Sequence, residues 1–296
     1  MTLPTDPTSI RPAATVIVLR PGAADAGALE VLMVRRNRAV AFMGGAYVFP
    51  GGRVDEGDAI TTPAAIAGVN GLDQVNRCPE LPREEEAAFR VAAIRELLEE
   101  AGLLLARRNG EIVDAAVAAA LRQSLPGNVP FAAHAASHGL TLALDAVMPF
   151  AHWVTPPVEI RRYDTRFLLA RVPPAQEASH DDNEMTALEW LRPADAVDRG
   201  ARGDIQLPPP TWTTLKRLAR FDSVDAAWRW AATTPIVRIE PGYAIDGGVR
   251  LLMLPGDPTY PLPPGLEPLE DVRFALSDGI WRPVDVTGSD PFLGRA

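Results

Sequence analysis

The segment from about residue 83 to 101 constrains this chain most, because it fits one long helix with two chemically opposite faces. Pro82 and the acidic residues after it suit the positive N-terminal end of a helix, and Gly102 suits its C-terminal end. At about 100° per residue, apolar side chains gather on one face and carboxylates on the other. The apolar positions are Val91, Ile94, Leu98 and Ala101, and the carboxylates opposite them are Glu96, Glu99 and Glu100.

Three carboxylates crowded on one helical face repel one another, which weakens the helix unless a cation lies among them. Oxygen ligands suit a hard divalent ion, so Mg²⁺ or Mn²⁺ is the expected cofactor. Arg95 can reach Glu99 one turn later and orient it. A glycine-rich stretch, Pro50-Gly51-Gly52, precedes the helix, and its backbone can approach an ion closely through the Gly52 carbonyl. Taken alone, the acidic face also fits a solvated helix surface.

Around this helix the pattern alternates between strands and helices, which predicts an α/β (α+β) sandwich. Residues 1–13 look like a loose arm, 14–221 the main domain, and 222–296 a C-terminal extension of unassigned role. Residues 59–81 have weak periodicity and are expected to form a surface excursion beside the active-site mouth. The expected strands span 14–19, 29–36, 44–52, 146–153, 165–172 and 185–191, and further helices span 114–125, 130–137, 193–198 and 211–220.

Composition narrows the function classes. A net charge of −9 disfavours a nucleic-acid partner, because a polyanion would be repelled. The single cysteine, Cys78, excludes an intrachain disulfide and a cysteine-based metal site. No apolar run has the length of a membrane span, and the N-terminal residues do not resemble a secretory signal. The C-terminal Gly-Arg-Ala is not a peroxisomal address. A cytoplasmic protein without a membrane or nucleic-acid partner is therefore expected.

The glycine loop and the acidic helix together resemble the Nudix box. Its pattern is Gly, five residues, Glu, seven residues, then Arg-Glu-apolar-x-Glu-Glu-x-Gly-apolar. Gly52 fits the first glycine, and the run from Arg95 to Leu103 fits the second half. Asp58 stands where the first-half Glu belongs, and about 29 extra residues, 59–87, separate the halves.

A box interrupted in this way is similar to the coenzyme A diphosphatase branch of the Nudix family. A second motif of that branch, ending in Phe-Pro-Gly-Gly, is matched in part, with Ala41 in place of an arginine. The resemblance covers roughly residues 13–220 and implies a Nudix fold, with a mixed central sheet flanked by helices. The residues that match the second motif are Leu32, Met33, Arg36, Gly45 and Phe49-Pro50-Gly51-Gly52.

The resemblance implies a metal-dependent diphosphatase acting on a small nucleotide-type substrate. Coenzyme A or an acyl-coenzyme A would give adenosine 3′,5′-bisphosphate and a 4′-phosphopantetheine product. The alternatives are a Nudix hydrolase of ADP-ribose or NADH, and a non-catalytic nucleotide-binding regulator with the same fold. The metal ligands would be Gly52, Glu96, Glu99 and Glu100, and the catalytic residues would be Arg95, Glu99, Glu100 and Glu184.

Several other side chains are candidates for substrate binding. Arg36 and Arg162 are expected to hold phosphate groups, whereas Arg166 is expected to form a surface ion pair. Trp153 and Tyr163 either stack on an adenine or belong to the core. Glu184 is a candidate for an additional ligand or base, and the nearby loop residue His180 is a weaker one. The extension is expected to cover the active site, form the arm of a homodimer, or extend the sheet.

Overall fold

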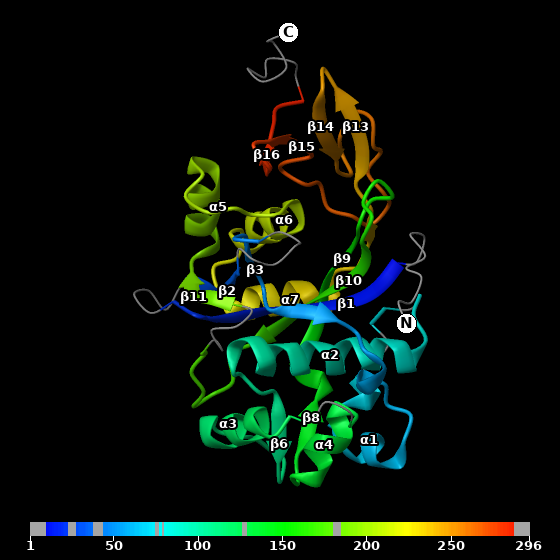
Figure 1. Cartoon of the computed structure of the whole chain (residues 1–296), viewed down its shortest axis with the longest axis vertical. Helices are drawn as coiled ribbons and strands as arrows, with labels where there is room; N and C mark the ends of the chain where they lie inside the picture. Colours follow the sequence, from blue (N-terminus) through cyan, green and yellow to red (C-terminus); the bar gives the residue numbers. More distant parts are fainter. Residues whose placement is uncertain are drawn as a thin grey trace, which may run out of the picture.

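A mixed eight-stranded sheet forms the centre of the molecule in the computed structural model (Figure 1). The structure describes residues 10–22, 28–37, 44–74, 77–78, 80–125, 129–179 and 185–286. The sheet has the strand order β11-β2-β1-β10-β9-β12, and β3 and β4 add to β2 and β1. Its strands are β1 (Ile10–Pro21), β2 (Leu29–Arg36), β3 (Tyr47–Val48), β4 (Gly51–Arg53), β9 (Val147–Val154), β10 (Arg162–Arg171), β11 (Met185–Leu191) and β12 (Arg238–Ile239).

Strand β1 has two partners along one edge, and this arrangement brings the glycine-rich segment into the sheet. Residues 13–15 of β1 pair with β4, and residues 19–21 pair with β2. On its other edge β1 runs parallel to β10. A Cβ on Gly51 would lie 2.7 Å from the Thr15 Cα, so only glycine allows this close pairing. Gly51 and Gly52 therefore belong to the separate short strand β4, and not to a glycine-rich loop at the end of one strand spanning 44–52.

Each face of the sheet carries its own hydrophobic core. Alternate β1 residues point to opposite faces: Val16 belongs to the core under α2 (Arg83–Ala101), and Ile17 to the core under the later helices. Figure 1 shows α2 on one side of the sheet and α5 and α6 on the other. The helices of that second side are α5 (Pro193–Arg202), α6 (Pro209–Leu218) and α7 (Val224–Thr233).

The segment inserted between the two halves of the motif contributes to the core, so its description as a surface excursion was wrong. Ala65 is fully buried and Val69 nearly so, and both pack in the α2 core. Its small apolar residues follow neither a helical nor a strand period, so the sequence pattern did not predict that the segment contributes to the core. The aligned insertion, 59–87, also runs into α2, because the helix already begins at Arg83.

This segment joins later residues in a small module below α2 in Figure 1. The module has a second sheet of order β5-β8-β6-β7. Its elements are η1 (Glu56–Asp58), α1 (Pro63–Ala67), β5 (Val69–Asn70), η2 (Leu72–Gln74), β6 (Ala106–Arg108), β7 (Glu111–Ile112), α3 (Ala115–Gln123), α4 (Phe131–Ser137), β8 (Thr141–Ala143) and η3 (Leu144–Ala146).

The C-terminal extension packs on the same face as α5 and α6. Its β12 runs parallel to β9, so the extension enlarges the central sheet, as one of the three expected roles required. A separate sheet of order β13-β14-β15-β16 follows, and its Phe274 is fully buried in the second core. The strands are β13 (Gly242–Asp246), β14 (Val249–Met253), β15 (Arg273–Ser277) and β16 (Ile280–Pro283).

The N-terminal boundary also differs from expectation. Strand β1 begins at Ile10, so residues 10–13 are paired with β10 and do not belong to a loose arm. Residues 1–9 lie outside the described part of the chain. The strand could not be predicted this far back because Pro12 interrupts its β-branched pattern. Among the described residues, no helix combines the length and apolar character that a membrane crossing requires.

Candidate active site

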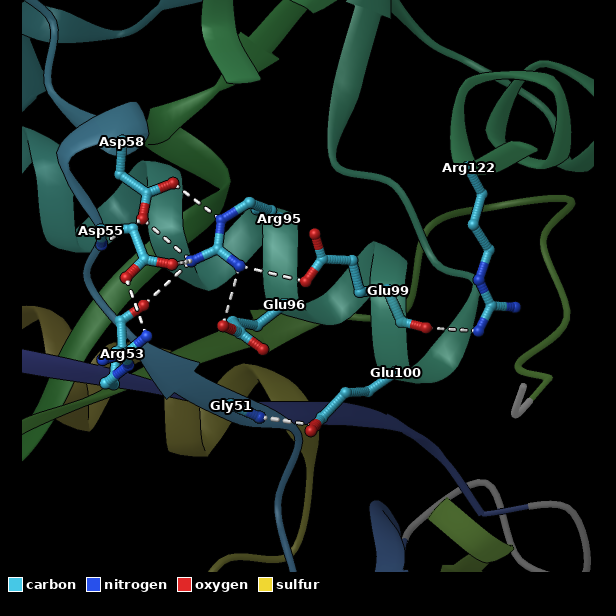
Figure 2. Close-up of polar contacts among 9 residues, drawn as sticks. All are labelled: Gly51, Arg53, Asp55, Asp58, Arg95, Glu96, Glu99, Glu100 and Arg122. Carbon is cyan, nitrogen blue, oxygen red and sulfur yellow. Dashed lines mark hydrogen bonds and ion pairs between the residues drawn. The ribbon is translucent and has the colours of Figure 1, made fainter. Parts of the chain in front are cut away.

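The acidic helix forms as its sequence predicts. The apolar side chains of Val91, Ile94 and Leu98 are fully buried against the sheet. This packing fixes the rotation of the helix, so that its carboxylates lie on the opposite face. Gly102 ends the helix in the left-handed region at φ 67°, where a Cβ would be strained. The Arg122 guanidinium of α3 donates a hydrogen bond to the Glu99 carbonyl oxygen at this end (Figure 2). The helix therefore holds its acidic residues on a fixed frame.

Two of the acidic side chains meet the glycine strand β4. The Gly51 N–H donates to the Glu100 Oε2 at 2.8 Å, and Glu100 is only 6% exposed (Figure 2). A Cβ on Gly52 would lie 2.8 Å from the Glu96 Oε2 and closer still to Oε1. Glycine at position 52 thus makes room for a carboxylate directly beside the backbone. The strand and the helix together concentrate acceptor oxygens at one place.

Arg95 links these carboxylates to the first half of the motif. Its Nε and Nη2 each donate to one Asp58 oxygen at 2.9 Å, and Asp58 is only 1% exposed (Figure 2). Its Nη1 donates to Glu96 at 2.8 Å and to Glu99 at 3.0 Å. Burial alone would lower the pKa of Arg95, but the Asp58 contact raises it above the ordinary value. The expected contact from Arg95 to Glu99 is confirmed.

The same geometry gives Asp58 a role that the sequence comparison left open. The short helix η1 brings the Asp58 carboxylate to the Arg95 guanidinium, although aspartate is one methylene shorter than the expected glutamate. A bidentate contact fixes the plane of the guanidinium as well as its charge. Asp58 is therefore an orienting group for Arg95, and the replacement does not leave the motif incomplete.

Burial raises the pKa values of the two glutamate carboxyls that contact Arg95. Burial, opposed by Arg95, raises the pKa of Glu96 to about 7. Burial also raises the pKa of Glu99, again against the effect of Arg95. The side chain of Glu99 is 39% exposed and turns toward Arg95, away from Gly51. Among the described residues, no three acidic, histidine or cysteine side chains are grouped closely enough to hold a metal ion.

The donor chemistry nevertheless fits a hard divalent cation. The groups at the site are carboxylate and backbone oxygens, which Mg²⁺ and Mn²⁺ prefer. The cradle at Gly52 admits a carboxylate that any larger residue would displace. A bound cation would also offset the burial of negative charge that raises the pKa of Glu96. Gly52, Glu96, Glu99 and Glu100 remain the predicted ligands.

An apolar pocket of ≈ 220 Å³ adjoins the carboxylates. Gly51 belongs to both sites, because it lines the pocket and donates to Glu100. The central sheet, the start of α6 and the C-terminal extension all contribute to its walls. The aromatic lining residues are Phe49, Trp153, Tyr163, Phe167 and Trp281. The pocket therefore lies next to the residue that contacts Glu100 and is concave enough to bind a small ligand.

The arginines expected to bind substrate have different surroundings. Arg36 lines the pocket, and its Nε is buried without a hydrogen-bond partner. Arg162 is already engaged, since it pairs with Glu240 at 2.6 Å and donates to the Thr155 carbonyl at 3.0 Å. Arg166 forms ion pairs, as expected, but it is only 4% exposed, so its assignment to the surface was wrong. Of the three, only Arg36 both faces the pocket and retains an unused donor.

The aromatic candidates have mixed roles. Trp153 is 4% exposed and packs in the second core, yet it also lines the pocket. Tyr163 lines the pocket beside it. Glu184 and His180 lie outside the described residues, as does Ala41.

Sequence reasoning missed the role of Gln176, which lies in the segment before His180 and Glu184 in the sequence. The buried Gln176 side chain accepts from the Leu104 N–H at 2.8 Å and donates to the Val113 carbonyl at 2.7 Å. These contacts tie this segment to the residues after α2. A glutamine in a polar loop carries no local sign of such a role, because its partners are distant in sequence.

Comparison with known proteins decides the family. The sequence model of the NUDT19 Nudix domain matches residues 7–218. The chain belongs to this Nudix family. Curated relatives include the acyl-coenzyme A diphosphatase NUDT19 of Gallus gallus, 29% identical over 282 residues that cover 79% of this chain and 74% of that protein. The Homo sapiens protein of the same name is 27% identical over 272 residues, covering 78% and 72%.

A solved structure supports the same assignment. The NUDIX hydrolase from Alicyclobacillus acidocaldarius is 29% identical, with a TM-score of 0.62, and the match covers 75% of this chain and 96% of that one. The family, the α/β Nudix fold and the hydrolase class expected from the sequence are therefore confirmed. Nudix hydrolases in general use divalent metals, which agrees with the donor chemistry of the α2 site.

Proposed function

We propose that this Nudix hydrolase cleaves the diphosphate of coenzyme A or an acyl-coenzyme A. The observation that carries the proposal is the double role of Gly51, which joins an acidic site to an aromatic pocket containing Arg36. A diphosphate beside Glu100 would have its nucleotide within reach of that pocket. The two relatives named as acyl-coenzyme A diphosphatases support the same substrate class.

Hydrolysis here adds the oxygen of one water molecule to one phosphorus and breaks the bond from that phosphorus to the bridging oxygen. The second phosphate leaves as a monoester, so the products are adenosine 3′,5′-bisphosphate and a 4′-phosphopantetheine. Glu96, Glu99, Glu100 and the Gly52 carbonyl would hold a divalent cation, Mg²⁺ or Mn²⁺, which would supply charge neutralisation and activation of water. Arg95 keeps Glu96 and Glu99 in position, and Glu184 remains the candidate base.

Arg36 is the better of the two arginine candidates for the ribose 3′-phosphate. A guanidinium with a buried, unused Nε gains a charge-assisted hydrogen bond when an anion binds. Arg162 would first have to give up its contact with Glu240. Coenzyme A carries the 3′-phosphate, whereas ADP-ribose and NADH do not, so this contact favours coenzyme A.

The test is a substrate panel. Incubation with Mg²⁺ and coenzyme A, acetyl-coenzyme A, NADH or ADP-ribose, followed by mass analysis, should give adenosine 3′,5′-bisphosphate from the first two most efficiently. Efficient cleavage of ADP-ribose or NADH, without cleavage of coenzyme A, would contradict the proposed substrate and favour the alternative hydrolase. Binding without cleavage of any of them, with Mg²⁺ or Mn²⁺, would favour the non-catalytic regulator. The predicted homodimer and cytoplasmic location are separate proposals, which gel filtration and cell fractionation would address.

A further inference from the structure

The C-terminal extension closes the pocket beside the acidic site. Pro241, Leu252 and Trp281 line it, and all three lie beyond residues 7–218, the part that matches the family model. Opposite partners come from the Nudix domain, where Trp153 and Tyr163 line the same space. Without the extension this pocket would lose one of its walls.

The extension is held firmly enough to act as a wall. The Trp212 Nε1 of α6 donates to Asp271 at 2.7 Å, and the same ring meets Phe274 edge-on. Arg162 pairs at 2.6 Å with Glu240, the residue before Pro241. These contacts fix the extension to α6 and β10 before any ligand binds, so little ordering is needed on binding. Arg162 is thus a positioning residue for the wall.

The chemistry of the pocket fits the nucleoside end of the substrate better than an acyl chain. Its aromatic residues offer faces for stacking a flat base, which a saturated chain cannot use in the same way. Arg36 lies in the same pocket with an unused buried donor. An acyl chain would leave this buried Nε without a hydrogen-bond partner, whereas a nucleotide phosphate could accept from it.

We propose that the C-terminal extension builds one wall of an adenine pocket, in which Trp281 is a specificity-determining residue that stacks on the base. The proposal rests on the diphosphatase function proposed above and adds the part of the chain that recognises the substrate. It makes the extension part of the substrate site, a role that neither the core motif nor the matched domain contains.

The test compares Trp281→Ala with Trp281→Phe and with Trp228→Ala. Trp228 is a matched control, because it lies in the extension but contacts Arg171 instead of the pocket. Trp281→Ala should lower kcat/KM by roughly tenfold or more, as loss of a base–aromatic stack does. Trp281→Phe should keep most of the activity, and Trp228→Ala nearly all of it. Calorimetric affinity for adenosine 3′,5′-bisphosphate should fall in parallel, with the thermal transition of each variant recorded as a check on folding.

The substrate series separates the two proposals. The loss in Trp281→Ala should be equal for coenzyme A, acetyl-coenzyme A and octanoyl-coenzyme A, which share the adenine. A loss that grows with acyl length would overturn the assignment and give the pocket to the acyl arm. Unchanged kinetics and product affinity would also overturn it. If ADP-ribose is cleaved instead of coenzyme A, the proposed function fails, while the same variants still test adenine stacking on that substrate.

Discussion

Two hollows adjoin the carboxylates of α2, and they differ in charge and in origin. One, of ≈ 480 Å³, is acidic: Asp55, Glu56, Asp58 and Glu99 surround Arg95 there. The other is the aromatic pocket, whose Arg36 has an unused donor. In the acidic hollow the Arg95 guanidinium is already paired with neighbouring carboxylates, so its role is structural. In the aromatic pocket the Nε of Arg36 remains available to donate a hydrogen bond to an anion. The comparison teaches that the pairing state of an arginine, more than its presence, distinguishes support from recognition.

The largest effect is expected at the carboxylates of the acidic helix. Glu100→Gln keeps the shape and the acceptor for Gly51 but removes the charge, so turnover should fall by at least about a hundredfold. Glu99→Gln should behave similarly. Steady-state kinetics at saturating Mg²⁺ measure the effect, and unchanged thermal transitions would show that the fold is intact. Glu85→Gln, an exposed position in the first turn of the same helix, is the control. Wild-type activity in both active-site variants would contradict the metal-site interpretation.

The second prediction sharpens the structural role of the acidic hollow. Asp58→Ala removes the bidentate partner of Arg95 and leaves a poorly solvated guanidinium, which should destabilise the fold by about 3–5 kcal/mol. Activity should fall too, because Arg95 no longer holds Glu96 and Glu99 in place. Urea unfolding and kinetics measure the two effects. Glu56→Ala is the control, since it removes an exposed carboxylate from the same hollow and should matter little. Equal stability of the two variants would mean that the Asp58 contact is dispensable.

The third prediction tests recognition in the aromatic pocket. Wild-type protein should cleave coenzyme A faster than dephospho-coenzyme A, and Arg36→Ala should remove roughly 10- to 150-fold of that preference. Activity on the dephospho form should stay nearly constant. Arg162→Ala should instead affect both substrates alike, because Arg162 supports the pocket wall through Glu240. Ratios of kcat/KM for the two substrates give the answer. A preference lost in Arg162→Ala and kept in Arg36→Ala would reverse the two assignments.

The acidic side of the site was largely predictable from sequence, because its information is local. A helical period of 3.6 residues places Glu96, Glu99 and Glu100 together and sends Leu98 to the core. The strand at 185–191 was also predicted to the residue. The bidentate contact of Asp58 was not visible, because 37 positions separate it from Arg95.

The aromatic pocket could not be predicted, because its walls come from residues as distant as Thr15 and Trp281. The pairing of Arg162 with Glu240 spans 78 positions and likewise has no local sign. The sequence therefore identified Arg162 as a candidate for phosphate binding but could not show that it already pairs with Glu240. The prediction for the inserted segment was wrong for a related reason. The burial of Ala65 depends on packing against residues distant in the sequence, which the local pattern does not show.

The smallest effect is expected at the edge of the acidic hollow, on α4, the helix that also supplies Phe131. Burial, together with neighbouring His138, lowers the pKa of His134 from its ordinary 6.5, and Ser124 contacts its Nε2 at 3.1 Å. A depressed pKa means that the unfolded chain binds the proton more readily than the folded one. The contribution of neutral His134 to stability is therefore present above pH 6.5 and declines as the pH falls through the lowered value. His134→Gln should flatten this decline slightly when urea unfolding at pH 7.5 and 5.5 is compared. His138→Gln is the matched control, because it removes only the electrostatic effect of His138 on the His134 pKa and leaves the effect of burial. An unchanged pH dependence in His134→Gln would show that other groups set the acid sensitivity of this module.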